Sequence, residues 1–330
     1  MHVRLKSCVR RAFGAVMGKR WVTSLEDLRL YAAVYEERSF TRAAERENST
    51  QSGVSQHVRK IERLFDVKLF IRKEVAIVPT PAGHVFYQRC IDILRRVGSA
   101  DDELRQLAGT DGEFDGEVTV GLIPTLTRCA LAPALTEFTS AHPNVSLKVI
   151  EAYSGALSQL VLTDDADFAI VPATKPTAGL VSAHFLTTPE VLVSSPNSNF
   201  KHLSPIMPSE LSGLKLIVPG PDNVRRATLE NYLVASDVQI ARFLELDAMM
   251  ATLDLIARSD WVAVLPGIMM GDEIDNGRFN LNPLSGPTLS TGLTCITAAR
   301  KVLSPVGDAF RKVLVDHVTD FNRRWDSFLD

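Results

Sequence analysis

The sequence predicts an α/β protein that carries a small α-helical domain at its N-terminus. Two observations support this prediction. Between Ser24 and Leu64 apolar residues recur at the spacing of short amphipathic helices, and from Val118 onward short apolar strands alternate with helices. One long helix, predicted over residues 81–108, separates the two regions. A length of 330 residues accommodates two or three domains.

The distribution of charge also divides the chain. Residues 1–110 contain 20 Lys and Arg residues against 13 Asp and Glu residues, whereas residues 111–330 contain 16 against 26, and the formal net charge is −3. A basic first part and an acidic second part indicate two roles, and the basic part is suited to binding a polyanion. With 45% apolar and 23% charged residues, the composition excludes a disordered or fibrous protein.

Neither export nor membrane insertion is expected. Residues 1–23 form a basic extension with six Lys or Arg residues and no acid, which is either a basic arm or the product of a misplaced start codon. Arg10 and Arg11 interrupt any signal-peptide core, and the apolar run 261–270 is too short to span a bilayer. We expect a cytoplasmic protein without cofactors, in which four separated cysteines stay reduced: Cys8, Cys90, Cys129 and Cys295.

The first domain is predicted from three helices and a hairpin. The first helix has one apolar face, made of Leu25, Leu28, Tyr31 and Ala32. Ser39 is a suitable N-cap for the second helix. The third begins near Gln51 and has an apolar stripe of Val54, Val58, Ile61 and Phe65. The short apolar or β-prone segments 69–73 and 76–79 suit a hairpin, so residues 24–80 are typical of a winged helix-turn-helix.

The polar face of the third helix is the candidate nucleic-acid contact. It consists of Gln51, Ser52, Ser55, Gln56 and Arg59, which are donors and acceptors of the kinds that read base edges and phosphates. The same face also suits an ordinary solvated three-helix bundle. Segment 59–73 favours DNA, because it contains six basic residues and two acidic ones.

The long helix over residues 81–108 is a candidate dimerisation element. Thr80 is a suitable N-cap and Pro81 fits the first helical position. Apolar residues then follow at alternating spacings of four and three, as in a coiled coil: Phe86, Cys90, Ile93, Val97, Ala100, Leu104 and Leu107. A helix that packs on its own domain is the alternative. Residues 109–116, rich in glycine and acid, are predicted to form a hinge.

The remaining residues, 117–330, are predicted to form two α/β lobes with a cleft between them. Strands and helices alternate there, which favours parallel sheets, and the segment is long enough for two such units. Ligands in these folds bind at the carboxyl ends of strands and the amino ends of helices.

Several segments between Ser39 and Gly83 resemble the LysR-type transcriptional regulator family in their order and spacing. They are residues 39–44, 51–55, 61–64, 67–72 and 80–83. Residues 118–131, 151–170 and 256–266 are more weakly similar to effector-domain segments of that family, so the resemblance covers about residues 24–320. One departure lies in the helix-turn-helix, where Glu47 and Ser49 replace apolar residues that are usual in the family.

The resemblance implies a cytoplasmic bacterial transcription factor with a two-lobed, periplasmic-binding-protein-like effector domain. Lobe I would comprise residues 117–189 and 298–330, and lobe II residues 190–297. The expected partners are double-stranded promoter DNA, a small carboxylate or other anionic effector, further copies of the chain in a dimer of dimers, and RNA polymerase. No membrane partner is expected.

The resemblance implies contact roles for Gln51, Ser52, Ser55, Gln56, Arg72 and Thr125, and the chemistry and position of the other residues suggest theirs. The expected DNA contacts are Thr41, Gln51, Ser52, Ser55, Gln56, Arg59, Arg72 and Lys73. The expected effector contacts, several of which also suit ordinary caps and turns, are Pro124, Thr125, Leu126, Thr127, Ser154, Gly155, Thr174, Ser194, Ser195 and Arg225. Ser194 and Ser195 are expected at the crossover between the lobes.

Catalytic signatures are absent from the sequence. It contains no Walker A motif, dinucleotide fingerprint, zinc-protease motif or nucleophile elbow, and its seven histidines have no metal-ligand spacing. We therefore expect a regulator. The alternatives are a small-molecule-binding protein or enzyme with a helical appendage, and a DNA-binding protein whose lobes only mediate protein contacts.

Overall fold

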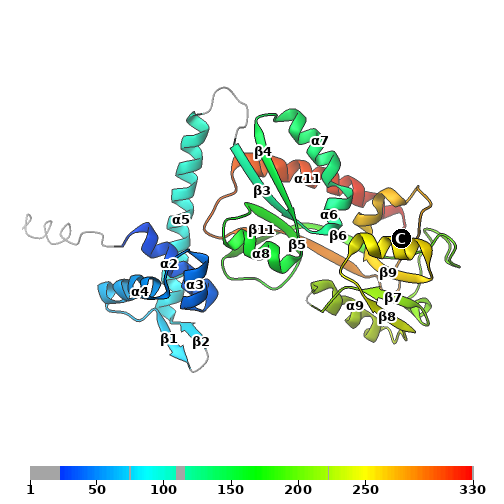
Figure 1. The fold of residues 1–330 in the computed structure, drawn as a ribbon, viewed down its shortest axis with the longest axis horizontal. Helices are drawn as coiled ribbons and strands as arrows, with labels where there is room; N and C mark the ends of the chain where they lie inside the picture. The colour runs from blue at the N-terminus through cyan, green and yellow to red at the C-terminus, as the bar shows by residue number, and fades with distance from the viewer. Residues whose placement is uncertain (1–22, 74–75, 109–115, 222, 329–330) are drawn as a thin grey trace, which may run out of the picture. The chain divides into compact units, whose positions relative to one another are not determined.

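Three short helices and a two-stranded hairpin form the N-terminal domain (Figure 1). The helices are α2 (Leu25–Glu37), α3 (Phe40–Arg46) and α4 (Gln51–Phe65). Strand β1 (Phe70–Lys73) pairs antiparallel with β2 (Ala76–Pro79), which confirms the predicted hairpin. The structure is a computed structural model that describes residues 23–73, 76–108, 116–221 and 223–328.

Local capping explains where these helices begin. The Ser24 hydroxyl accepts from the Asp27 N–H, and the Asp27 carboxylate accepts from the Ser24 N–H, which is a reciprocal capping box. Ser39 accepts from the N–H of Arg42 at the start of α3. Thr50 accepts from the N–H of Gly53 at 3.1 Å and fixes the first turn of α4.

Helix α5 (Pro81–Ala108) begins where a glycine allows close packing. The Thr80 hydroxyl accepts from the Gly83 N–H at 3.0 Å, and the Tyr31 hydroxyl donates to the Gly83 carbonyl at 2.7 Å. A Cβ at Gly83 would lie closer than 3.0 Å to the carbonyl oxygen of Leu69. The predicted helix over residues 81–108 is confirmed, and its first turn is tied to both α2 and β1.

Lobe I is a five-stranded sheet in the order β4-β3-β5-β11-β6. Strand β3 runs parallel to β4 and β5, whereas β11 runs antiparallel to β5 and β6. Its elements are β3 (Gly116–Leu122), α6 (Pro124–Cys129), α7 (Leu131–Ala141), β4 (Val145–Glu151), α8 (Ser154–Leu162), β5 (Phe168–Pro172), β6 (Leu180–Ser194), β11 (Ser290–Ala298) and α11 (Pro305–Arg323).

Lobe II continues the same sheet from the far half of β6, in the order β6-β9-β7-β8, and β10 pairs with β6 on its other side. Its elements are η1 (Pro208–Leu211), β7 (Lys215–Val218), α9 (Val224–Ala235), β8 (Arg242–Glu245), α10 (Met249–Arg258), β9 (Trp261–Pro266), η2 (Gly267–Glu273) and β10 (Asn280–Pro283), and the short η3 (Asp326–Phe328) follows α11.

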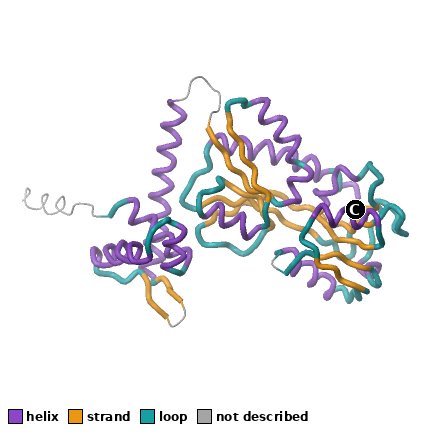
Figure 2. The backbone as a smooth tube through the Cα atoms, viewed as in Figure 1, coloured by secondary structure: helices purple, strands orange, loops and turns teal. Residues whose placement is uncertain are grey.

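Both faces of the lobe II sheet are buried, as the alternation of side chains requires. On β9, Ala263 and Leu265 pack with α10, while Val262 and Val264 pack on the opposite face with α9 residues such as Leu229. Figure 2 shows the strands in the interior of each lobe with helices outside them. Within the described residues, no helix is both long and apolar enough to span a membrane.

The sheet differs from the prediction in strand direction and in one boundary. The alternating elements predicted parallel sheets, but β6 is antiparallel to β9, β10 and β11 because it carries the chain from one lobe into the other. The return crossing lies before Ser290, since β11 pairs with β5 of lobe I. The boundary expected at residue 298 therefore coincides with the end of β11.

The C-terminal helix links the lobes a third time. Helix α11 packs through Phe310 and Leu314 in the lobe I core. Just beyond it, Trp325 is fully buried among the apolar residues of lobe II. The Arg324 guanidinium donates to the Gly271 carbonyl at 2.7 Å and pairs with Asp275. The two lobes are therefore joined by β6, by the segment before β11, and by the end of α11.

Candidate functional site

The exposed face of α4 carries most of the side chains that were predicted to contact DNA. Gln51, Ser52, Gln56 and Arg59 are exposed, as is Thr41 at the start of α3. On the opposite face, the stripe residues Val54, Val58 and Ile61 are buried, whereas Phe65 is exposed. Ser55 is 8% exposed, so it offers much less surface than its neighbours.

A cavity of about 710 Å³ lies between α4 and the hairpin. Its lining combines apolar residues from several elements with three cations, two carboxylates and the polar Ser55 and Gln56. The apolar residues are Phe40, Val58, Val67, Phe70 and Ile77, the cations are Arg59, Arg63 and Lys68, and the carboxylates are Glu62 and Asp66. In the hairpin, Arg72 pairs in register with Ile77 and Lys73 with Ala76. The side chains of Arg72 and Lys73 lie outside the described set.

One buried carboxylate fixes the orientation of α4. The side chain of Asp27 is fully buried, and it accepts from His57 Nδ1 at 2.5 Å and from Lys60 Nζ at 2.7 Å. Burial raises the pKa of Asp27, but hydrogen bonds from Lys60, the Ser24 N–H and His57 outweigh it and leave the pKa at about 2. Asp27 is therefore ionised at neutral pH and joins the start of α2 to the middle of α4.

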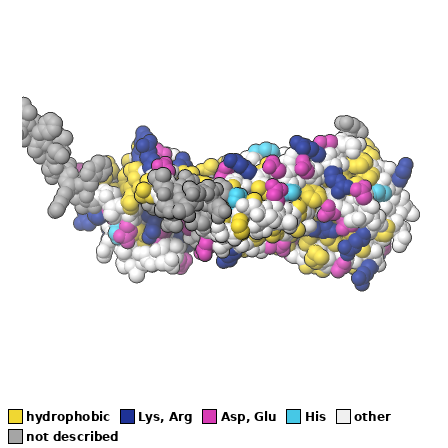
Figure 3. All heavy atoms as spheres, turned by 90° about the horizontal axis from the view of Figure 1, so that it is seen from above, with side chains coloured by type: hydrophobic (Ala, Val, Ile, Leu, Met, Phe, Trp, Pro, Cys, Tyr) yellow, Lys and Arg dark blue, Asp and Glu magenta, His cyan; other side chains and the backbone are white. Residues whose placement is uncertain are grey.

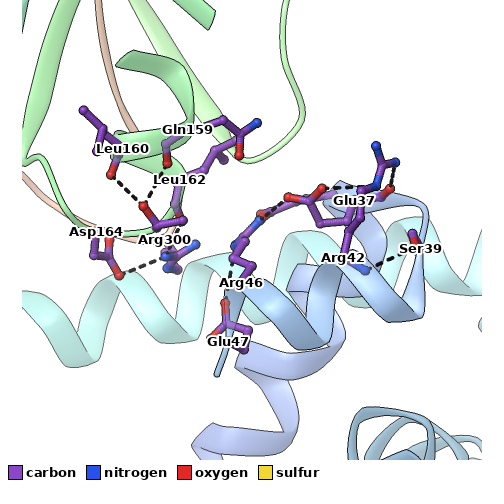
Figure 4. A network of polar contacts seen from close by, with 12 residues as sticks. Glu37, Ser39, Arg42, Arg46, Glu47, Gln159, Leu160, Leu162, Asp164 and Arg300 are labelled. Carbon is purple, nitrogen blue, oxygen red and sulfur yellow. Dashed lines mark hydrogen bonds and ion pairs between the residues drawn. The ribbon is translucent and has the colours of Figure 1, made fainter. Parts of the chain in front are cut away.

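The departure at Glu47 is explained by an ion cluster around Arg46, part of which is drawn in Figure 4. The Arg46 side chain is 4% exposed and pairs with Glu36 at 2.6 Å, and with Glu37 and Glu47 at 3.4 Å each. Burial would lower the pKa of Arg46, but the glutamates raise it. Glu47 also pairs with Arg29 at 2.9 Å, so charge pairing stands in place of an apolar contact at this turn.

The predicted dimer seam on α5 divides into two parts. Cys90 is fully buried, and Phe86 packs edge-on against Tyr31, so both face their own domain. Burial raises the pKa of the Cys90 thiol to about 12, which makes it an unreactive packing residue. Ile93, Val97 and Leu104 are exposed on the single chain, as is Ala100. The side chain of Leu107 lies outside the described set.

Loops at the carboxyl ends of the lobe I strands hold most of the predicted effector contacts. Pro124, Thr125, Leu126 and Thr127 open α6 after β3, and Ser154 and Gly155 open α8 after β4. Thr125 and Leu126 are buried, and the Thr127 hydroxyl bonds to Glu151 and to the Pro124 carbonyl. Thr174 follows β5 and is exposed. These loops end parallel strands that share one sheet, so they lie along one edge of it.

Ser194 and Ser195 lie away from that edge, which corrects their expected position at the crossover. The chain crosses near Glu190, which pairs with Pro266 at the carboxyl end of β9. Four residues later, Ser194 lies at the amino-terminal end of β9 and is fully buried. Its hydroxyl contacts that of Ser198 at 2.9 Å, and Ser195 accepts from the Asn197 N–H, so Ser194 ends β6 and Ser195 belongs to the turn that follows.

The arginine that was predicted to receive an anion is already paired. Arg225, at the start of α9, makes a two-point contact with Glu190 at 3.1 and 2.6 Å, and donates to the Val264 carbonyl at 3.0 Å. Glu190 is 3% exposed and also accepts from the Thr291 hydroxyl at 2.5 Å. This network ties α9 to the crossover strands and leaves Arg225 with an internal counter-ion.

A second arginine bridges the lobes. Arg128 of α6 pairs with Glu273 of η2 at 2.5 Å, and the two side chains are 18% and 8% exposed. Arg128 also donates to the Met269 carbonyl at 3.3 Å. Because α6 carries the Thr125 and Thr127 positions, the loop expected to touch an effector is braced directly on lobe II.

Sequence reasoning missed Tyr153 and Asp247. The Tyr153 hydroxyl of lobe I donates to the Asp247 carbonyl of lobe II at 2.7 Å. Each residue follows a strand, β4 in one case and β8 in the other, so the carboxyl ends of these strands face each other across the two lobes. The only signal in the sequence was position, since both residues precede a predicted helix.

The surface charges on the visible face are mixed, and the described cysteines Cys90, Cys129 and Cys295 are buried. On the face shown in Figure 3, Lys and Arg side chains are interspersed with Asp and Glu side chains. Among the described residues, no group of three or more His, Cys, Asp or Glu side chains could hold a metal ion. Burial raises the pKa of the Cys129 thiol to about 12 and that of Cys295 to about 11.

Comparisons with known proteins agree with this arrangement. Residues 25–84 match the family described as "Bacterial regulatory helix-turn-helix protein, lysR family", and residues 111–319 match the family described as "LysR substrate binding domain". The nitrogen assimilation regulatory protein nac of Klebsiella aerogenes is 25% identical, and the alignment covers 90% of this chain and 95% of that protein.

Two solved structures share the fold. A full-length OxyR variant from Pseudomonas aeruginosa has a TM-score of 0.56 at 20% identity, and the match covers 92% of this chain and 98% of that one. Full-length CbnR complexed with its target DNA has a TM-score of 0.51 at 18% identity, and the match covers 89% of this chain and 99% of that one.

Proposed function

This chain belongs to the LysR family of bacterial transcriptional regulators, and from that premise we propose how it binds promoter DNA and answers to a small effector. Family membership provides a helix-turn-helix DNA-binding domain and an effector-binding domain, and the family consists of regulators rather than enzymes. The alternative of an enzyme with a helical appendage is therefore set aside. Promoter DNA lies in the bacterial cytoplasm, which is where we propose that the protein acts.

The exposed polar face of α4 is the observation that carries the DNA part of the proposal. Gln51, Ser52 and Gln56 would read base edges in the major groove, while Arg59 and the hairpin residues Arg72 and Lys73 would contact phosphates. Thr41 would donate to a phosphate from the start of α3, and Ser55 would contribute at the rim of the cavity beside α4. CbnR, which has a similar fold, was solved with its target DNA.

A gel-shift titration with the DNA upstream of the chain's own gene tests this proposal. Arg72→Ala should weaken binding to specific and unrelated DNA alike and should reduce the dependence of affinity on salt, since a phosphate contact is lost. Gln51→Ala should instead reduce the ratio between the affinity for the specific DNA and the affinity for unrelated DNA, because a base contact is lost. If Arg72→Ala binds DNA as tightly as wild type at moderate salt, this mode of docking is wrong. If the wild-type protein shifts no DNA even at low salt, the proposal of a DNA-binding regulator is wrong.

We propose that α5 joins two chains through its exposed apolar residues. Ile93, Val97, Ala100, Leu104 and Leu107 continue the seam at coiled-coil spacing, whereas Phe86 and Cys90 anchor the helix to its own domain. A dimer presents two α4 helices to two half-sites of DNA. We also propose that two such dimers associate, and that the DNA-bound assembly contacts RNA polymerase.

The proposed effector site lies between the lobes, at the loops that open α6 and α8. Thr125, Thr127, Ser154 and Thr174 provide hydroxyl groups there, and Pro124, Leu126 and Gly155 shape the loops. We retain a small carboxylate or other anion as the first class to examine. Because Arg225 and Arg128 have internal counter-ions, backbone N–H groups and hydroxyls would bind that anion.

Thermal-shift measurements test the effector proposal. Small carboxylates, uncharged analogues and amines of matched size are each added to the full chain, and a ligand of the native state raises the melting temperature. Stabilisation by carboxylates alone supports the proposed class, and stabilisation by amines or uncharged compounds alone refutes it. If no compound of any class binds, lobes that serve only for protein contacts become the better explanation.

A further inference from the structure

The contact between Tyr153 and Asp247 joins the two lobes on their exposed side. The Tyr153 hydroxyl donates to the Asp247 carbonyl at 2.7 Å, although the residues are 94 positions apart in the sequence. Tyr153 is 41% exposed, so water and small molecules have access to this bond. A tyrosine that makes its hydrogen bond across two lobes, rather than within one, responds directly to their separation.

The acceptor in this contact is held rigidly by lobe II. The Asp247 carboxylate accepts from the Gly220 N–H at 3.0 Å, and the preceding residue, Leu246, donates its N–H to the Val218 carbonyl at 3.0 Å. These two hydrogen bonds attach the segment that contains the Asp247 carbonyl to strand β7 and the loop after it in lobe II.

The donor is placed beside the proposed effector loops. Tyr153 is the N-cap residue of α8 and directly precedes Ser154 and Gly155. Its side chain does not cap that helix, which leaves the hydroxyl to reach across to lobe II. Burial, Asp247 and Glu151 together raise the pKa of Tyr153, so the phenol stays protonated and able to donate.

Two other contacts between the lobes are of a different kind. Arg128 and Glu273 form a largely buried ion pair, and Trp325 is fully buried in the lobe II core. These contacts are built into the packed interior and resist separation. The hydrogen bond of Tyr153 is exposed to water, which competes for both partners, so it is the weaker contact and the first to break.

We propose that the Tyr153 hydroxyl and the Asp247 carbonyl form a latch that holds the two lobes together beside the loop at Ser154 and Gly155. Opening this latch releases the start of α8, where Ser154 is half-buried and Gly155 is exposed, from lobe II. This inference rests on the proposed effector site, because the latch lies next to the loop that opens α8. Tyr153 acts as a positioning residue that sets the separation of the lobes.

Hydrogen–deuterium exchange of the full chain without added effector tests the latch, using Tyr153→Phe. Removing one hydroxyl should raise the exchange rate about two- to tenfold, the range expected for one net hydrogen bond. The increase should appear in peptides that contain Gly220 or Leu246 in lobe II and Ser154 in lobe I. The matched control is Tyr232→Phe, because Tyr232 donates to the Pro287 carbonyl at 2.8 Å within lobe II.

The outcomes separate the latch from a general loosening of the protein. Faster exchange on both sides in Tyr153→Phe, with Tyr232→Phe unchanged at Ser154, supports the proposal. Unchanged exchange in Tyr153→Phe, or the same acceleration at Ser154 in the control, overturns it. Because no effector is needed, failure here is distinct from failure of the thermal-shift screen.

Discussion

At the scale of single residues, Asp27 determines how α4 is presented. It accepts hydrogen bonds from the Ser24 N–H at 2.7 Å, from His57 and from Lys60, and its side chain has no exposed area. A carboxylate buried in this way stabilises the fold only while it is ionised. The capping role of Ser24 and Asp27 follows from their spacing, but the contacts to α4 join residues far apart in the sequence and could not be predicted.

Replacing Asp27 by Asn should lower the free energy of unfolding by about 2 kcal/mol at pH 7, given a pKa lowered from 3.8 to about 2. Since the pKa is lower in the folded protein, this contribution is full above about pH 4 and is lost as the pH falls toward 2. Urea unfolding of wild type and variant between pH 7 and pH 3 measures the difference.

Asp260→Asn is the matched control for that series. Asp260 pairs with Lys215 at 2.6 Å but has a 70% exposed side chain, so its loss should leave the unfolding curve unchanged at neutral pH. An Asp27→Asn variant as stable as Asp260→Asn at pH 7 would contradict the role given to Asp27.

Arg225 and Ser194 show which residue roles sequence could not determine. Arg225 of helix α9 was expected to bind an anion, but its counter-ion Glu190 lies 35 residues earlier, on strand β6. Ser194 was expected at the crossover, and its placement depended on the antiparallel pairing of β6 with β9. By contrast, exposed polar positions on α4 were predictable, because helical periodicity alone separates them from Val54 and Val58.

At the scale of elements, caps and periodicity predicted the N-terminal domain closely. The hairpin and the start of α5 agree because local turn and cap residues specify them. Strand β8 and the first half of β6 were not predicted, because they are largely exposed and show no clear alternation. Strand β11 and helix α11 were also not predicted, although each carries apolar residues that complete the lobe I core.

Two glycines of α5 should respond oppositely to alanine. Gly83→Ala places a methyl group against the Leu69 carbonyl and should lower stability by about 1–3 kcal/mol. A methyl group at Gly98 would meet nothing within 4 Å, so Gly98→Ala should raise helix stability by up to about 1 kcal/mol. Thermal unfolding of the two variants measures both, and equal shifts of the same sign would contradict the packing described for Gly83.

The apolar seam of α5 makes a prediction about assembly. Ile93→Asp places two charges in the proposed dimer contact and should raise the dimer dissociation constant by on the order of 100-fold. Val85→Asp is the control, because Val85 is 65% exposed on the same helix but outside the seam. Sedimentation velocity over a dilution series measures the dimer dissociation constant of each variant. An equal increase of that constant in the two variants would argue against the proposed seam.

At the scale of the whole molecule, buried contacts join the two lobes. Glu273→Gln leaves Arg128 without its counter-ion in a largely buried position and should cost about 2 kcal/mol of stability. Glu137→Gln, which removes an exposed partner of His317, should have little effect. The melting temperatures of the two variants measure this difference. A Glu273→Gln variant as stable as Glu137→Gln would show that the Arg128–Glu273 pair does not stabilise the contact between the lobes.

The burial of Trp325 in lobe II has a consequence for synthesis on the ribosome. Lobe I needs β11 and α11, and the lobe II core needs Trp325, so neither lobe can complete its packing until residue 325 has been translated. The helices and hairpin of the N-terminal domain, in contrast, end at Pro79. In a nascent chain the helix-turn-helix domain can therefore fold well before the proposed effector site can form.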